Sequence, residues 1–69
     1  MEKPVLDERT LPLDIQERIR DLLECESKND TLHLYIYWGE LYGFINASQH
    51  GGEISKELAD FLREKYLGI

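Results

Sequence analysis

Residues 35–46 read YIYWGELYGFIN, and this stretch admits two structures. It combines three tyrosines, a tryptophan, a phenylalanine and three aliphatic residues with two glycines, Gly39 and Gly43, that lie four positions apart. A β-hairpin could turn at Gly39-Glu40, because glycine suits the first loop position of a type II′ turn. A single helix with one aromatic side is the other structure. The fold class depends on which of the two forms.

The distribution of large side chains favours the helix. A hairpin over residues 32–47 that pairs Trp38 with Leu41 would have apolar or aromatic residues on both faces, and two short helices do not readily cover both. In a helix the aromatic side chains gather within about half of the circumference. Two interior glycines cost about 1 kcal/mol each, whereas burial stabilises by roughly 1.5–3 kcal/mol per large side chain. We therefore expect a helix from about 31 to 49, with the hairpin as the alternative.

The flanking segments predict two further helices. Residues 1–10 are polar and contain Pro4, so we expect a flexible N-terminal arm followed by one helical domain over 11–69. Pro12 suits the first turn of a helix. The apolar stripe of this first helix comprises Ile15, Ile19, Leu22 and Leu23. In the turn SKND (27–30), Asn29 can adopt a left-handed conformation and Asp30 can cap the next helix.

The last helix is expected after the HGG break at 50–52. Ser55 is a suitable N-cap, and Gly68 is placed to end the helix. The apolar stripe of this helix comprises Ile54, Leu58, Phe61, Leu62 and Tyr66. The predicted fold class is therefore all-α, a small three-helix domain; the alternative is an α+β helix–β-hairpin–helix arrangement.

The central helix also provides the candidate interaction surface. Gly39 and Gly43 fall on one line of this helix, forming a flat ridge with Leu32, Ile36 and Ala47. We expect the first helix of the same chain to cover this ridge, with a second copy of the chain as the alternative. The candidate interaction residues are Tyr35, Tyr37, Gly39, Tyr42, Gly43 and Phe44. Among the large ones we favour Tyr37 and Phe44 for contact, and we assign Trp38, Leu41 and Ile45 to the core.

Charge and composition restrict the classes of partner. Fourteen acidic residues against eight basic residues give a net charge of −6, which opposes binding to nucleic acid because such binding depends on Lys and Arg. No apolar run reaches the roughly 20 residues of a membrane span, and we expect no membrane association. Cys25 is the only cysteine, so an internal disulfide is excluded and a cytoplasmic location is expected.

No arrangement of residues predicts catalysis, and we expect the chain not to be an enzyme. His33 and His50 have no metal-ligand spacing with Cys25 or with each other. Cys25 has no activating base close to it in the sequence, so a packing role is expected. The HGG segment lacks the Lys and Ser/Thr of a phosphate-binding loop. We therefore expect neither a metal nor a cofactor.

Two segments carry a resemblance to a known group of proteins. WGELYGFIN (38–46) and GEISKELADFLREKYLG (52–68) resemble small accessory proteins of unassigned function from conjugative transposons and related mobile elements of Gram-positive gut bacteria. The matching positions are Trp38, Leu41, Tyr42, Gly43, Gly52, Ile54, Ser55, Leu62, Arg63, Tyr66 and Leu67. The resemblance covers under half of the chain and implies a mobile-element origin, without any catalytic or binding residue.

Three functions are consistent with the sequence. The first is a protein-interaction module that binds a protein partner or weakly associates with itself through the aromatic residues of the central helix. The second is a small DNA-binding regulator of the excisionase or helix-turn-helix type, but Lys56, Arg63 and Lys65 of the last helix are balanced by acidic neighbours. The third is an acidic inhibitor that mimics DNA. The first is the hypothesis we favour.

Overall fold

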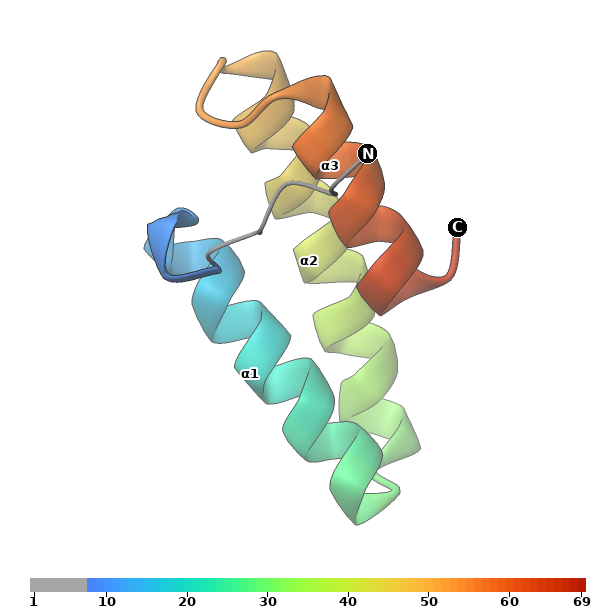
Figure 1. Cartoon of the computed structure of the whole chain (residues 1–69). Coiled ribbons are helices and arrows are strands. Elements are labelled where there is room, and N and C mark those ends of the chain that lie inside the picture. Colours follow the sequence, from blue (N-terminus) through green and yellow to red (C-terminus); the bar gives the residue numbers. More distant parts are fainter. Residues whose placement is uncertain (1–7) are drawn as a thin grey trace, which may run out of the picture.

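The computed structural model describes residues 8–69, and within that range the chain is helical with no strand. The main elements are α1 (Leu13–Lys28), α2 (Thr31–His50) and α3 (Lys56–Leu62), as Figure 1 shows. A 3-10 turn, η1 (Glu8–Thr10), precedes α1, and a π-helical segment, η2 (Arg63–Leu67), continues α3. The all-α three-helix prediction is confirmed, because residues 32–47 lie within α2 rather than in a hairpin.

The structure describes the last three residues of the predicted N-terminal arm, residues 1–10. Residues 1–7 of that arm lie outside the described range. Residues 8–10 form η1, which is fastened to α1 by the Gln16 side chain. Its Nε2 donates hydrogen bonds to the carbonyl oxygens of Arg9 (3.2 Å) and Leu11 (2.6 Å). A short 3-10 turn therefore precedes Leu11, which is buried in the core.

The turn between α1 and α2 forms as its residue types predict. Asn29 has a φ of 55°, in the left-handed region that ends α1, and asparagine tolerates this region better than most residues. Asp30 Oδ1 accepts a hydrogen bond from the backbone N–H of His33 at 3.2 Å. This bond caps the N-terminus of α2, where the backbone N–H groups lack partners within the helix.

The boundaries of the last helix also match the prediction. Ser55 Oγ accepts a hydrogen bond from the backbone N–H of Leu58 at 3.1 Å, as an N-cap does. Gly68 adopts a φ of 72° directly after η2, a conformation that glycine takes without a steric penalty. Together α3 and η2 form one short helical segment, hereafter α3–η2.

The core gathers residues from all of these segments around the inner side of α2. Leu41 and Ile45 of α2 are fully buried, as expected, and Trp38 is half-buried. Two predicted core positions differ: Leu23 and Phe61 are exposed. Cys25 is buried in α1, in line with the packing role expected for it. The buried hydrophobic residues are Leu11, Ile15, Ile19, Leu22, Cys25, Leu41, Ile45, Ile54, Ala59, Leu62 and Leu67.

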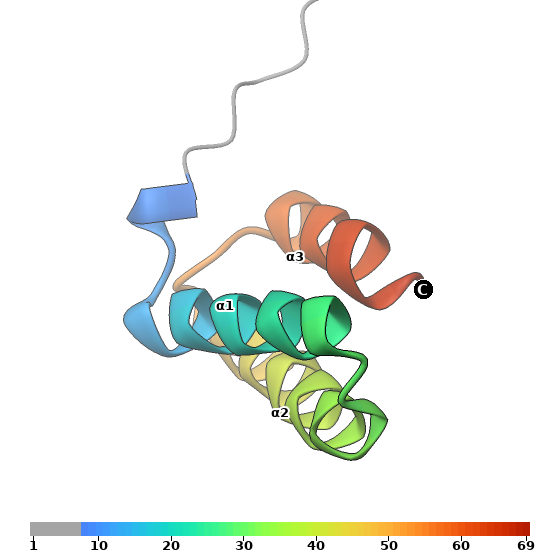
Figure 2. The same ribbon diagram turned by 90° about the horizontal axis from the view of Figure 1, so that it is seen from below.

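The third helix covers only part of α2. Figures 1 and 2 show α1 running antiparallel beside α2, while α3–η2 lies along the C-terminal half of α2. The end of η2 is marked by Trp38, whose Nε1 donates a hydrogen bond to the carbonyl oxygen of Leu67 at 3.3 Å. Beyond this point the N-terminal half of α2 has α1 on one side and no helix of the described chain on the other (Figure 1). This difference in coverage positions the candidate site.

Candidate functional site

The side of α2 that faces away from the core carries large apolar side chains that the fold leaves exposed. Their exposed fractions are 69% for Leu32, 82% for Tyr35, 48% for Ile36 and 39% for Tyr42. Residues three, four and seven positions apart share a side of a helix, so small residues continue the same surface toward the C-terminus. We call this surface the outer face of α2, comprising Leu32, Tyr35, Ile36, Gly39, Tyr42, Gly43 and Ala47, all of them exposed.

The outer face contains no Asp, Glu, Lys or Arg side chain, because Glu40, the one such residue of α2, contacts α1. Arg18 of α1 approaches Glu40 with Nε 3.0 Å from Oε2. The Nδ1 of His33 lies 2.7 Å from Oδ2 of Asp30 in the preceding turn. Uncharged surface is therefore continuous along α2 in a chain in which 32% of the residues are charged.

The prediction that the first helix covers the glycine ridge, the line of Leu32, Ile36, Gly39, Gly43 and Ala47, is wrong. A Cβ atom added to Gly39 or to Gly43 would meet no atom of another element within 4 Å. The first helix packs instead against the side of α2 that carries Tyr37, because the larger side chains bury more apolar area there. Arg18 of α1 places its guanidinium 5.4 Å from the centre of the Tyr37 ring, which is a cation–π distance. The ridge consequently lies open on the outer face.

A hollow adjoins the outer face in the N-terminal half of α2. It has a volume of about 430 Å³ and is lined by Thr31, Leu34, Tyr35 and Trp38. The rings of Trp38 and Tyr42 are stacked, with 5.6 Å between their centres and 12° between their planes. The hollow exists because η2 ends beside Trp38, so no helical side chain continues along Leu34 and Thr31. An apolar group of a partner could be accommodated there.

The structure divides the six candidate interaction residues into two groups. Tyr35, Gly39, Tyr42 and Gly43 belong to the outer face. Tyr37 and Phe44, which the sequence analysis favoured, are half-buried and packed against the core. Sequence reasoning also did not propose Leu32, Leu34 and Ile36 as contact residues, although the ridge included two of them. For Leu32 and Ile36 the signal was their i, i+4 spacing in line with the two glycines. Leu34 lies instead within the aromatic half of the helix.

A second hollow, of about 220 Å³, lies where α1 meets α2 and gathers ionisable groups. It brings His33 and Asp30 together with Cys25, which their separation in the sequence did not indicate. Burial raises the pKa of the Cys25 thiol, and the carboxylates of Asp30, Glu24 and Asp21 raise this pKa further. A thiol held in its protonated form is a poor nucleophile. The imidazole of His33 is itself hydrogen-bonded to Asp30, so the cluster gives no support to cysteine chemistry.

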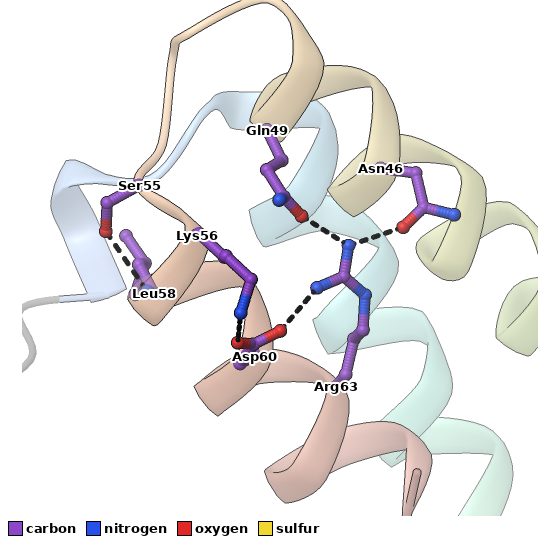
Figure 3. A network of polar contacts seen from close by, with 7 residues as sticks. All are labelled: Asn46, Gln49, Ser55, Lys56, Leu58, Asp60 and Arg63. Atoms are coloured by element: carbon purple, nitrogen blue, oxygen red, sulfur yellow. Dashed lines mark hydrogen bonds and ion pairs between the residues drawn. The ribbon is translucent and has the colours of Figure 1, made fainter.

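Lys56 and Arg63 of α3–η2 are engaged in a polar network (Figure 3), and the Nζ of Lys65 lies 4.9 Å from the centre of the Tyr66 ring. The Nη2 of Arg63 donates to Oδ1 of Asn46 and to Oε1 of Gln49, each at 2.6 Å. Its Nη1 donates to Oδ1 of Asp60 at 3.0 Å, and Lys56 Nζ donates to Oδ2 of the same carboxylate at 3.0 Å. These contacts join η2 to α2 and give the helix no array of open cations that could bind phosphates.

Within residues 8–69, no group of three or more His, Cys, Asp and Glu side chains is placed to hold a metal ion. None of the helices in this range has the length and hydrophobicity needed to cross a bilayer. Comparisons with protein-family models, with curated proteins and with solved structures find no match for this chain. The outer face of α2, with its adjoining hollow, is therefore the feature of the described chain that best supports a function.

Proposed function

We propose that this chain is a small protein-interaction module that binds a protein partner through the outer face of α2. The observation that carries this proposal is the combination of large exposed apolar side chains, from Leu32 to Tyr42, with the absence of charge on the same surface. The largest contiguous apolar patch of a small protein is often functional, and exposed patches of this kind occur at sites of association. Tyrosine and tryptophan are effective anchors, because they supply a large contact area at a modest cost in side-chain entropy.

Nucleic acid fits the surface less well than protein does. Affinity for a polyanion comes from Lys and Arg side chains that neutralise phosphates, and the outer face has none. On α3–η2, Lys56 and Arg63 both contact Asp60. The acidic balance of the chain adds repulsion from phosphate. A DNA-binding regulator is therefore the less favoured function.

The experiment is a comparison of photo-crosslinking at two matched positions. A benzophenone amino acid replaces Tyr42 on the outer face in one variant and Phe61 on α3 in the other. Both are aromatic residues with similar exposure, 39% and 44%, so the two probes differ mainly in the surface that they sample. Cells that produce each variant are irradiated, and the crosslinked products are identified by mass spectrometry.

The proposal predicts one or a few defined crosslinked species from position 42 and diffuse, weak products from position 61. A product that contains a second copy of the chain supports the proposal as fully as a product that contains another protein. Absence of a defined product from position 42, with the chain folded and present at the same level as the Phe61 variant, would falsify it. The mobile-element origin and the cytoplasmic location remain predictions that this experiment does not address.

A further inference from the structure

We infer that the partner of the outer face is a second copy of this chain, in a two-fold symmetric dimer in which α2 packs against α2. This inference rests on the proposed function, because it names the occupant of the same surface. In a two-fold interface, each copy contributes the same patch, so that surface has to be complementary to itself. Three properties of the outer face meet this requirement: its area, its shape and its lack of charge.

The exposed area is sufficient for a small specific dimer. A whole tyrosine side chain buries about 150–250 Å², so the exposed parts of Leu32, Tyr35, Ile36 and Tyr42 amount to an area on the order of 500 Å² per copy. Two copies would then bury roughly 1,000 Å² from these four residues alone, which is the lower range of specific interfaces. The glycine ridge and the hollow add to this contact. The expected dimer is consequently in the weak range.

The shape of this surface provides both projecting side chains and a hollow that could accommodate them. Leu32 and Tyr35 project from the first turns of α2, and the hollow, which Tyr35 lines together with Thr31, Leu34 and Trp38, lies on the same half of the helix. With the two-fold axis placed beside the first turns of α2, the projecting side chains of each copy face the hollow of the other. Gly39 and Gly43 have free space above them, which lets a second helix approach closely.

Electrostatics favour this face over the others for contact between identical chains. Two copies that each carry a net charge of −6 repel one another. The exposed side of α1 carries four acidic residues, Asp14, Glu17, Glu24 and Glu26, against two basic ones, Arg20 and Lys28, so contact through α1 would bring two net negative surfaces together. The outer face of α2 lets two copies touch without a charged side chain in the contact. A partner with a basic surface would gain more from α1 than from this uncharged face.

The test compares Leu32→Glu with Leu13→Glu as a matched control. Both leucines lie in the first turn of a helix and have nearly equal exposure, 69% and 66%, but Leu13 belongs to α1. Both variants add one negative charge. Sedimentation equilibrium of the full chain is measured from about 1 μM to about 1 mM, the range expected for a small interface. Circular dichroism of each variant verifies that the helices are retained.

The unmodified chain and Leu13→Glu are expected to dimerise alike, and Leu32→Glu is expected to raise the dissociation constant by roughly tenfold or more. Tyr35→Lys, which introduces the opposite charge, is expected to have a similar effect and is the second variant should Leu32→Glu unfold. A chain that stays monomeric at every concentration overturns the inference, as do equal effects of Leu13→Glu and Leu32→Glu.

The two proposals fail in distinguishable ways. A monomeric chain whose position 42 crosslinks to a different protein retains the interaction module and removes the second copy as its partner. A monomeric chain without a defined crosslink removes both proposals. A dimer that neither outer-face variant weakens shows that the copies associate through another surface, which also overturns the inference.

Discussion

Helices α1 and α2 resemble each other on the side that faces the core and differ on the side that faces away from it. Each buries a stripe at helical spacing: Ile15, Ile19 and Leu22 in α1, and Leu41 and Ile45 in α2. The exposed charged residues of α1 are Asp14, Glu17, Arg20, Glu24, Glu26 and Lys28. The outer face of α2 has none.

This difference separates the residues whose type is explained by folding from the exposed apolar residues of α2, whose type folding does not explain. The charged outer side of α1 is the ordinary surface of an amphipathic helix in water. On α2, the exposed leucine, isoleucine and tyrosines contribute little to the packing of residues 8–69 while they retain apolar area in contact with solvent. Packing and contact with water therefore account for most of α1, apart from the exposed Leu13 and Leu23, but for only the inner side of α2.

The largest expected effect on the free energy of unfolding comes from truncating a buried residue of α2, and the same substitution on the outer face is the comparison. Ile45→Ala should lower the free energy of unfolding by about 2–5 kcal/mol, because Ile45 is fully buried and the truncation leaves a cavity. Ile36→Ala, on the outer face, should change it by less than about 1 kcal/mol. Urea denaturation followed by circular dichroism, at a concentration at which the chain is monomeric, measures both. Equal losses would contradict the division of α2 into an inner side and an outer face.

The next effect concerns the half of α2 that α3–η2 covers. Arg63→Met should cost about 1–3 kcal/mol, because it removes charge-assisted hydrogen bonds to Asn46, Gln49 and Asp60. Lys56→Met is the control: Lys56 contacts the same Asp60 carboxylate, but its exposed ion pair contributes less than about 1 kcal/mol. Urea denaturation compares the two variants. A cost for Lys56→Met as large as that for Arg63→Met would contradict the larger contribution assigned to the contacts of Arg63 with α2.

A gain in stability is expected when the glycines of the outer face are replaced by alanine. Gly39→Ala and Gly43→Ala should each raise the free energy of unfolding of the monomer by about 1 kcal/mol, because alanine has the higher helix propensity and an added Cβ meets no neighbour within 4 Å. Gly52→Ala is the control and should be destabilising, since Gly52 has a φ of 76°. The same denaturation assay measures all three. A loss of stability at position 39 or 43 would mean that the ridge is covered within the chain.

The smallest expected effect lies in the turn that joins the two helices. A hydrogen bond from the backbone N–H of His33, together with its side chain, holds the pKa of Asp30 below its usual value. A carboxyl with a lowered folded-state pKa stabilises the fold above its unfolded pKa of about 3.9 and loses that contribution as the pH falls through the folded value. Asp30→Ala should therefore lower the thermal unfolding midpoint near neutral pH and have a smaller effect in acid. Calorimetry at several pH values measures the difference.

Asp30→Asn is the control for this pH dependence. It keeps a capping oxygen for the His33 N–H but cannot titrate. Its unfolding midpoint should therefore stay close to that of the unmodified chain near neutral pH and vary less below that range. An effect of Asp30→Ala that is constant across all pH values would show that the ionised form of Asp30 contributes nothing to the cap.

Local chemistry made much of the fold predictable. Asn29, Asp30, Ser55 and Gly68 end or begin helices through their own conformations and hydrogen bonds, which depend on neighbours within a few positions. The choice of helix over hairpin for residues 32–47 followed from the segregation of large side chains. Both are properties of one segment and do not depend on where other segments pack.

The placement of neighbouring helices could not be predicted from the sequence in the same way. Helical spacing shows that Tyr35 and Tyr37 lie about 200° apart around α2, but not which of the two α1 covers. Nor does spacing show that α3–η2 ends opposite Trp38. These outcomes depend on helix lengths and on how three surfaces fit together, so the sequence indicated the aromatic character of the site without indicating which aromatic residues would remain exposed.

The position of Trp38 has a practical consequence. This residue is the only tryptophan of the chain; its indole nitrogen binds the last turn of η2, and its ring borders the open hollow. Its fluorescence therefore reports from the boundary between the packed and the exposed part of α2. Filling the hollow should shift the emission to shorter wavelength, whereas detachment of the C-terminal turn should shift it to longer wavelength. The chain thus contains an intrinsic optical probe that distinguishes occupancy of the surface from loosening of the fold, without an added label.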